Sequence, residues 1–367
     1  MMEIKSLKEI ASLIRTGKTP PTKEEKYFDG EINWYSPGDL DKTKYLFTAK
    51  RTITQQAIED KKAITFPKDT LLVGCIGDIG KLGITSELSS SNQQLTGILP
   101  NDETNVSYLY YWFKGNKKVL ENYSNNAVVP ILNNRTLETV KIPLPPLDQQ
   151  KKIAAILDAA DAYRQKTKAL IEKYDELTQS LFLDMFGDPV ANPKGWEKKE
   201  FTNVFGITTG KLDSNQAVAD GQYPFFTCAK QVSRIDVFSF DQEALMLAGN
   251  NAAGVYDIKY YNGKFDAYQR TYVLTLNEGI NYQFFRFHLE QKLKELQKVS
   301  IGSGTKYLTM KILERIMLLC PDQENQNIFT SRVNAIEKQK AQAQASLAQA
   351  EDLFNSLLQR AFKGELS

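Results

Sequence analysis

The sequence predicts an α+β protein in which one unit is built twice, as two globular, mostly β domains separated by two long antiparallel helices that form a coiled coil with pseudo-twofold symmetry. The first observation behind this prediction is an internal repeat: residues 93–186 align with residues 269–362 at a constant offset of 176 and without a gap. The second is a long helical stretch after each domain, with apolar residues three and four positions apart. A period this long indicates tandem domains, because solenoid repeats span about 20–50 residues. The identities between the copies include Gln93/Gln269, Asn105/Asn281, Leu137/Leu313, Gln150/Gln326 and Phe186/Phe362.

The size and composition of the chain are those of an ordinary globular protein. Its 367 residues are too many for a single core, and 42 % are hydrophobic and 25 % charged. A formal net charge of +2 permits a nucleic-acid partner without requiring one. Residues 1–14 lack the apolar core of a signal peptide, so we expect a cytoplasmic protein. The expected boundaries are 1–147 for the first domain, 148–186 for the first helix, 187–323 for the second domain and 324–364 for the second helix.

Each domain is expected to open with a short helix and to continue in strands. Leu7, Ile10 and Ile14 recur at helical spacing, which predicts a helix over Ile4–Arg15 that ends at the following Gly and Pro residues. In the second copy, Trp196–Phe205 takes this place. Short apolar runs bounded by turn residues predict strands, and an aromatic-rich stretch predicts one helix in each domain. The expected strands are 32–35, 63–66, 70–76, 83–85, 95–99, 244–248 and 272–276, and the expected aromatic helices are 106–122 and 282–297.

Each long helix follows a proline and carries one apolar seam. A helix of this length needs a partner for its apolar stripe, and the other copy is the nearest one. The alternative is that each stripe packs on its own domain. Because the first helix must return the chain to a second domain, the simplest arrangement is an antiparallel rod of about 55 Å with one domain at each end. The first seam is expected at positions 153, 156, 160, 163, 167, 170, 174, 177 and 181, with Ile153, Ile156, Leu170, Leu177 and Leu181 as its main contacts, and the second at Phe329, Val333, Ile336, Ala343, Leu347, Ala350, Phe354 and Leu357.

Three features resemble catalytic or nucleotide-binding sites only in part. Thr16-Gly17-Lys18-Thr19 resembles the end of a P-loop, but Ser12 stands where the first glycine is needed. The glycines at 74, 77, 80 and 83 indicate a structural turn, because another strand follows them and not a helix. His288, the one histidine, replaces Trp112 of the other copy and is expected to be packed. Three scattered cysteines indicate neither a disulfide framework nor a zinc site. The sequence therefore predicts no catalytic residue and no metal site.

The candidate reading residues are polar side chains beside strands. Asn92-Gln93-Gln94 corresponds to Tyr268-Gln269-Arg270 in the repeat, and amide and guanidinium groups can bond base edges in two places at once. Alternatively, Gln93 and Gln269 are buried strand residues that bond backbone groups, and the basic residues are an ordinary solvated surface. The candidate phosphate contacts are Lys18, Thr19 and Lys81 in the first copy and Lys211, Lys230 and Lys306 in the second.

Several motifs together resemble the specificity subunit of type I restriction-modification systems. Thr16-Gly17-Lys18-Thr19-Pro20, followed by Trp34-Tyr35-Ser36-Pro37-Gly38-Asp39-Leu40, is similar to the start of that family's recognition domain. Residues 143–154, with the sequence PLPPLDQQKKIA, resemble its junction between domain and spacer helix, and residues 359–366 resemble its C-terminal end. The second copy departs from the pattern, with Cys320-Pro321-Asp322 at the junction and Lys211-Leu212-Asp213 in place of Lys18-Thr19-Pro20.

This resemblance implies a non-catalytic DNA-binding subunit whose two target-recognition domains each read half of a bipartite DNA target. It implies two modification (methyltransferase) subunits docked on the long helices, and restriction subunits joined to them. S-adenosylmethionine, ATP and Mg would then be bound by those partners and not by this chain. Two other readings remain open: a coiled-coil scaffold without its own sequence readout, and a self-contained DNA methyltransferase or nuclease-related protein.

Overall fold

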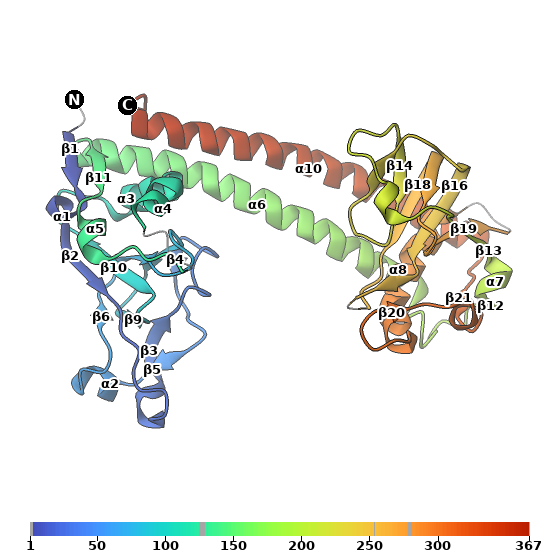
Figure 1. Cartoon of the computed structure of the whole chain (residues 1–367), viewed down its shortest axis with the longest axis horizontal. Coiled ribbons are helices and arrows are strands. Elements are labelled where there is room, and N and C mark those ends of the chain that lie inside the picture. The colour runs from blue at the N-terminus through green and yellow to red at the C-terminus, as the bar shows by residue number, and fades with distance from the viewer. Residues whose placement is uncertain (1–2, 125–128, 253, 278–280, 367) are drawn as a thin grey trace. The chain divides into compact units, whose positions relative to one another are not determined.

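The computed structural model describes residues 3–124, 129–252, 254–277 and 281–366, and these form two compact units (Figure 1). Unit 1 combines Met1–Lys168 with Ala345–Ser367, and unit 2 is Ala169–Gln344. Two long helices, α6 (Leu147–Phe186) and α10 (Gln323–Lys363), each contribute residues to both units. The predicted α+β class, with a sheet-containing fold built twice and two long helices, is confirmed. No helix in the described part of the chain is long and apolar enough to cross a membrane.

Unit 1 is built on a five-stranded sheet in the order β2-β10-β7-β8-β4. A four-stranded sheet, β5-β3-β9-β6, forms a lobe beside it, and β1 pairs with β11 near the start of α6. Helix α3, which is buried along most of its length, packs on β7 and β8. The elements of unit 1 before α6 are β1 (Glu3–Ser6), α1 (Leu7–Ile10), β2 (Ala11–Thr16), η1 (Glu25–Tyr27), β3 (Phe28–Tyr35), β4 (Tyr45–Leu46), β5 (Thr52–Ile53), α2 (Gln55–Glu59), β6 (Thr65–Phe66), β7 (Leu71–Gly74), β8 (Leu82–Thr85), β9 (Ser89–Ser91), β10 (Leu95–Pro100), α3 (Val106–Gly115), α4 (Lys117–Tyr123), α5 (Asn134–Glu138) and β11 (Lys141–Leu144).

Unit 2 has a six-stranded sheet in the order β13-β19-β16-β18-β14-β15, packed against helix α8. Strands β14 and β18 run parallel, so both end at the same edge of the sheet. The elements of unit 2 between the long helices are β12 (Lys198–Glu200), α7 (Phe201–Val204), β13 (Phe205–Thr209), η2 (Ser214–Gln216), β14 (Tyr223–Phe226), β15 (Ser233–Ile235), β16 (Phe240–Ala248), β17 (Asn250–Asn251), β18 (Ile258–Ala267), β19 (Thr271–Leu276), α8 (Tyr282–Val299), β20 (Lys306–Tyr307), α9 (Met310–Leu313) and β21 (Met317–Leu319).

The predicted opening helices are wrong in both copies. Ile4–Arg15 forms strand β1, the single turn α1 and strand β2, and Trp196–Phe205 contains β12, α7 and the start of β13 in the same order. Leu7 and Ile10 are fully buried in the short turn, which a capping box closes through the Ser6 N–H donating to Glu9 Oε2 at 2.7 Å. Strand pairing with distant partners, β10 and β11, overrides the local helical spacing.

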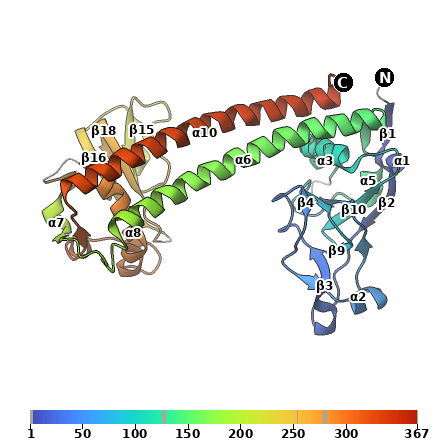
Figure 2. The ribbon, with the colours of Figure 1, turned by 180° about the vertical axis from the view of Figure 1, so that it is seen from behind.

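The two long helices run antiparallel in each unit (Figures 1 and 2). In unit 1, Lys168 Nζ lies 3.0 Å from Glu351 Oε1, and the Arg164 guanidinium stacks on the Phe354 ring at 4.4 Å. In unit 2, Lys340 pairs with Asp175. All eight predicted seam positions of the second helix are buried or half-buried. Phe329 and Val333 belong to the hydrophobic core of unit 2, and Phe354 belongs to that of unit 1.

The first helix matches the predicted seam at every second position, because residues 153, 160, 167, 174 and 181 are buried or half-buried. Ile153 is buried and Leu181 half-buried as expected, but Ile156, Leu170 and Leu177 are 39 %, 42 % and 50 % exposed. Leu157 and Thr178, each one position after Ile156 and Leu177, are buried instead. Ile156, Tyr163, Leu170 and Leu177 instead form an apolar row on the surface.

Threonines occupy two buried positions of this helix, Thr167 at a predicted seam position and Thr178 one residue after the predicted Leu177. The hydroxyl of Thr167 donates to the Tyr163 carbonyl at 2.9 Å, and that of Thr178 donates to the Tyr174 carbonyl at 3.0 Å. A hydroxyl satisfied inside its own helix can be buried at little cost, so threonine can occupy the seam as an apolar residue would.

Several residues that are identical between the two copies lie at the junction between each domain and its long helix. Asn105 and Asn281 cap α3 and α8 in the same way, each side-chain oxygen accepting from the backbone N–H three residues later. Gln150 Nε2 donates to the Pro145 carbonyl at 2.8 Å, and Gln326 Nε2 donates to the Pro321 carbonyl at 2.7 Å. These buried amides bond backbone groups that would otherwise be left without partners, which accounts for their identity between diverged copies.

His288 lies in the aromatic core of unit 2, as the sequence predicted for a packed residue. Its ring lies against both Phe182 and Phe284, with centroids 6.0 and 5.8 Å away. The side chain is fully buried, and Nε2 accepts the Leu319 N–H at 2.9 Å. Burial lowers the pKa of His288 from its ordinary value to about 3. The imidazole is therefore held neutral.

This depressed pKa predicts an acid-sensitive unit 2. The unfolded chain takes up a proton on His288 below about pH 6.5, whereas the folded chain resists protonation down to about pH 3, so stability is lost as the pH falls through that window. We expect the free energy of unfolding to fall by up to about 1.4 kcal/mol per pH unit from this group. Denaturant titrations at pH 7 and pH 5 measure the effect. His288→Phe should flatten the difference between the two pH values, and an unchanged difference would contradict the assignment.

Candidate nucleic-acid interface

One end of the five-stranded sheet gathers the candidate residues of the first copy. The Gly17 N–H donates to the Leu95 carbonyl and the Lys18 N–H to the Ser91 carbonyl, both at 2.9 Å. The Cys75 N–H donates to the Gln94 carbonyl at the same distance. These bonds bring residues 17–19, 75–81 and 92–94 together, and we call these three segments the loop end of unit 1. All six predicted residues of the first copy lie on it: Lys18, Thr19, Lys81, Asn92, Gln93 and Gln94.

The amides at this loop end are held in fixed orientations. Asn92 is buried; its Oδ1 accepts the Gln94 N–H at 3.0 Å, and its Nδ2 donates to Gln94 Oε1 at 2.9 Å. Gln93 is exposed, and its Oε1 accepts a hydrogen bond from the Thr19 hydroxyl. The exposure of Gln93 excludes the alternative of a buried strand residue. Asn92 therefore supports the turn from within, while Gln93 faces outward from it.

The two lysines of this loop end are both partnered. Lys18 Nζ donates to the Lys61 carbonyl at 2.6 Å, and Lys81 Nζ lies 2.8 Å from Asp78 Oδ2. Both contacts are on the surface, where such pairs are weak and can be exchanged for a phosphate.

A basic and aromatic lobe beside this loop end was not predicted from the sequence. The Arg51 guanidinium stacks on Phe28 at 4.5 Å and on Trp34 at 5.4 Å. Trp34 Nε1 in turn donates to the Lys18 carbonyl at 3.3 Å, which ties the lobe to the loop end. The signal available in the sequence was the Trp34-Tyr35-Ser36-Pro37 motif, but its contact with residue 18 depends on tertiary structure.

The corresponding end of the unit 2 sheet gathers the candidates of the second copy. The Gln269 N–H donates to the Leu212 carbonyl, the Gly249 N–H to the Arg270 carbonyl and the Tyr268 N–H to the Phe226 carbonyl, each at 2.9 Å. We call residues 210–213, 227–230, 249–252, 268–270 and 301–307 the loop end of unit 2. It carries all six predicted residues of the second copy: Lys211, Lys230, Tyr268, Gln269, Arg270 and Lys306.

Arg270 and Gln269 are the exposed reading candidates of unit 2. The Arg270 guanidinium lies 5.4 Å from the centre of the Tyr307 ring, and a hydrogen bond with Tyr307 raises the pKa of Arg270 above its usual value. Gln269 Nε2 donates to Asp213 Oδ2 at 3.4 Å. Both candidates line a pocket of about 370 Å³ at this end. Neither Tyr307 nor Asp213 was predicted, because each reaches its partner from a segment distant in the sequence.

A glycine in each copy lets the two reading segments meet. A Cβ atom on Gly17 would overlap the Ser91 side chain and the Asn92 carbonyl, and one on Gly210 would overlap the carbonyl of Ala267. Both glycines belong to the Thr-Gly-Lys sequence that ends the first long strand of its domain. The glycine in the partial P-loop resemblance is therefore explained by close backbone packing and does not indicate a nucleotide-binding loop.

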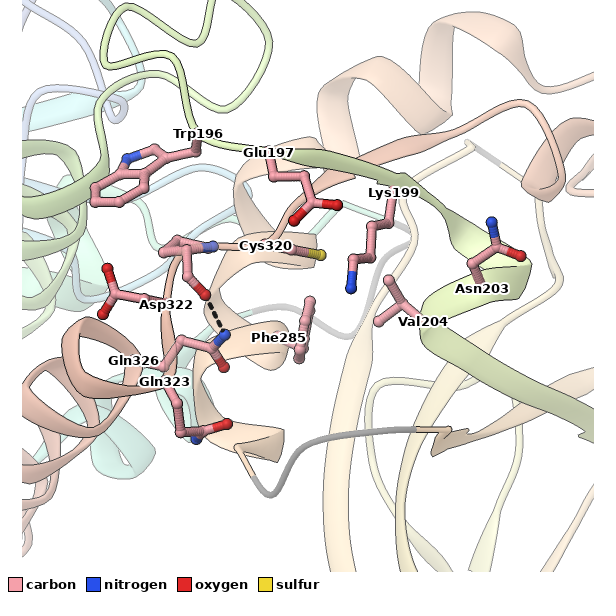
Figure 3. Close-up of a pocket in the computed structure, with 11 residues that line it drawn as sticks. Trp196, Glu197, Lys199, Asn203, Val204, Phe285, Cys320, Asp322, Gln323 and Gln326 are labelled. Atoms are coloured by element: carbon pink, nitrogen blue, oxygen red, sulfur yellow. Dashed lines mark hydrogen bonds between the residues drawn. The ribbon is translucent and has the colours of Figure 1, made fainter.

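Neither the pocket at the start of α10 nor the glycine-rich turn carries the features of a catalytic site. A pocket of about 530 Å³ in unit 2 is lined by Trp196, Lys199, Cys320 and neighbouring residues where α10 begins (Figure 3). It adjoins Val204, whereas strand β13 reaches the loop end at Thr209. The glycine-rich segment after β7 is a turn, as predicted, closed by the Gly74 N–H bonding the Lys81 carbonyl at 2.8 Å. Among the described residues, no group of three or more His, Cys, Asp and Glu side chains could hold a metal.

Comparison with known proteins identifies related chains along the whole length. Residues 1–174 and 193–350 match the family described as type I restriction modification DNA specificity domain. The type I restriction enzyme MjaIX specificity subunit of Methanocaldococcus jannaschii is 26 % identical over 408 aligned residues, which cover 99 % of this chain and 93 % of that protein. The EcoDI specificity subunit of Escherichia coli is 35 % identical over 179 residues, which cover 48 % of this chain and 39 % of the relative.

Solved structures show the same fold. The crystal structure of the type I restriction-modification system S subunit from M. genitalium matches with a TM-score of 0.66 and 16 % identity, over 99 % of this chain and 96 % of that one. A chain from a study of complex assembly and conformational transition in a type I restriction-modification system matches with a TM-score of 0.60 and 17 % identity, over 100 % and 98 % of the two chains. At these identities the likeness concerns the fold.

Proposed function

Because the chain belongs to the type I restriction-modification DNA specificity family, we propose that it is the DNA sequence-specificity subunit of a type I restriction-modification complex. It reads a bipartite DNA target through its two recognition domains and docks the modification subunits. The observation that carries this function is the repeated loop end. In each unit, basic residues surround one exposed glutamine. This glutamine and the Gly-Lys pair of the Thr-Gly-Lys sequence are identical between two copies that differ at most other positions of their loop ends. Sequence readout needs such a combination of phosphate contacts and base-edge contacts.

The exposed apolar row of α6 supports docking of the modification subunits. Ile156, Tyr163, Leu170 and Leu177 are spaced seven residues apart and are 39–56 % exposed. Residues at this spacing lie on one face of a helix, and apolar groups that recur on an exposed face indicate a protein partner. We propose two modification subunits, one for each repeated half, with restriction subunits joined to them.

Catalysis is assigned to the partners in this proposal. The one histidine is sealed in an aromatic stack, where it cannot reach DNA as a base. S-adenosylmethionine would be bound by the modification subunits, and ATP and Mg by the restriction subunits. The complex would act in the cytoplasm, because the named relatives come from bacteria and archaea, whose chromosomes lie there.

Profiling adenine methylation in the genome, with and without this chain, tests the function. With the cognate modification subunits present, we expect methylation at one motif made of two short half-sites with unread base pairs between them. Deleting the chain should remove that motif completely. Methylation by the purified chain alone would establish a self-contained methyltransferase, and sequence-independent DNA binding by the complete complex would establish a scaffold; either result would overturn the proposal.

A further inference from the structure

The side-chain amide of the glutamine shared by the two loop ends is held in opposite orientations in the two units. Gln93 and Gln269 are equivalent in the repeat and both are exposed. In unit 1 the bond to Thr19 occupies the amide oxygen of Gln93, whereas in unit 2 the bond to Asp213 occupies the amide nitrogen of Gln269. The two domains therefore present different ends of the same side chain.

The orientation in unit 2 is dictated by chemistry. A carboxylate accepts hydrogen bonds and has no hydrogen to donate, so the amide group that faces Asp213 must be the NH2. Asp213 is itself positioned by its turn, because its Oδ1 accepts from the Asn215 N–H and the Ser214 hydroxyl, both at 3.4 Å. The backbone bond from the Gln269 N–H to the Leu212 carbonyl, at 2.9 Å, fixes the register of the two segments. Oε1 of Gln269 is thereby directed away from Asp213.

In unit 1 the residue that faces the glutamine is a hydroxyl donor. Thr19 lies in the segment that the Lys18 N–H anchors to the Ser91 carbonyl, so its hydroxyl is delivered to the turn that carries Gln93. Among the hydrogen bonds of the described residues, none uses Gln93 Nε2 or Gln269 Oε1. Gln93 therefore presents two donors, and Gln269 presents an acceptor.

We infer that Thr19 and Asp213 are positioning residues that set opposite base preferences in the two half-sites through one shared glutamine. In the major groove, an outward acceptor on Gln269 pairs with an exocyclic amine, which cytosine and adenine carry. Outward donors on Gln93 pair with the acceptor edges of guanine or thymine. This inference rests on the proposed function and adds the base class that each domain selects at one position.

The test is a methylation assay of the full chain in complex with its modification subunits. The substrate is a plasmid library in which both half-sites are randomised, and the readout is the preference at each base pair. Asp213→Ala releases the amide of Gln269, and we expect selectivity at one base pair of one half-site to fall about fivefold, the worth of one hydrogen bond. Asp213→Lys donates to Oε1, turns the NH2 outward and should invert that preference towards guanine or thymine. Thr19→Val should change only the other half-site.

The controls separate readout from charge and from folding. Asp220→Lys makes the same charge change at an exposed position whose side chain makes no hydrogen bond within the described part of the chain, and it should leave the motif unchanged. Asp213→Glu keeps the carboxylate and should restore the wild-type preference. Uniformly weaker methylation with the same motif in Asp213→Ala and Asp213→Lys would show a merely structural role and would overturn the inference. If the wild-type complex methylates no bipartite motif, the proposed function itself fails.

Discussion

Gly210→Ala is expected to abolish recognition of one half-site while leaving the other half-site readable. The added Cβ would occupy the position of the Ala267 carbonyl oxygen, and backbone cannot move aside as a flexible side chain can. The segment that carries Lys211 and Asp213 must therefore separate from the turn that carries Gln269. Overpacking of this kind costs about 1–3 kcal/mol of stability. Loss of one or two base contacts, at about 1–3 kcal/mol each, should lower methylation of the native target by about 5- to 10,000-fold.

Gly304→Ala is the matched control for this substitution. Gly304 lies in the same loop end of unit 2, and a Cβ there would meet no atom within 4 Å. We expect methylation by this variant to equal that of the wild type. Gly17→Ala should reproduce the defect in the opposite half-site, because a Cβ there overlaps the Asn92 carbonyl. The steric explanation would be wrong if Gly210→Ala methylated the native target as efficiently as Gly304→Ala does.

The sequence could predict those parts of the fold in which one periodicity dominates. The second long helix shows this, since Phe329, Val333 and Phe354 repeat at seam spacing and are buried in the structure. The first helix matches the predicted seam only at every second position. Its buried residues include Thr167 and Thr178, whose polarity is cancelled by bonds within the helix. Hydrophobicity alone prefers Leu177 to the adjacent Thr178, so that position of the seam was predicted one residue too early.

The opening segments could not be predicted from local pattern for a different reason. Leu7, Ile10 and Ile14 fit helical spacing, yet Ile14 pairs with Ile98 across the sheet and only one helical turn remains. The pairing partner lies more than 80 residues away, and nothing in a local window reports it. Pairing with a distant strand therefore determines that this segment is a strand and not a helix, as is common for short apolar runs.

The candidate site was predictable in its main residues and not in the residues that orient them. Gln93 and Gln269 were found because they are identical between the copies, and the structure places both at exposed loop ends. Thr19 was selected as a phosphate contact, whereas its hydroxyl bonds Gln93. Asp213 was noted only because it replaces Pro20 of the first copy, and it was not selected as a site residue because an acidic side chain does not fit a phosphate-binding pattern. Their roles follow from hydrogen bonds between distant segments.

Lengthening both long helices by one heptad should change the distance between the half-sites that the complex prefers. Duplicating residues 166–172 in α6 and residues 344–350 in α10 extends both helices at matching levels. This choice follows the pairing of Lys168 with Glu351 and preserves the heptad register. Seven residues add about 10 Å at ~1.5 Å each, which corresponds to about three base pairs of a duplex that rises ~34 Å per turn. Genomic adenine methylation, profiled as for the wild type, reports the new spacer.

The insertion changes the distance between the two domains and their rotation about the DNA axis by different amounts, so the new spacer distinguishes the two effects. One heptad rotates an α-helix by only about 20° relative to the seam, whereas three added base pairs turn the duplex by about 100°. If the helices set only the distance between the domains, the preferred spacer should become about three base pairs longer. If both domains must also keep the same orientation towards the DNA grooves, the preferred spacer should change by a different number of base pairs. In both cases the native spacer loses its advantage. A heptad added to α6 alone should disrupt the pairing of the helices and abolish methylation. An unchanged spacer in the double insertion would show that the helices do not set the distance between half-sites.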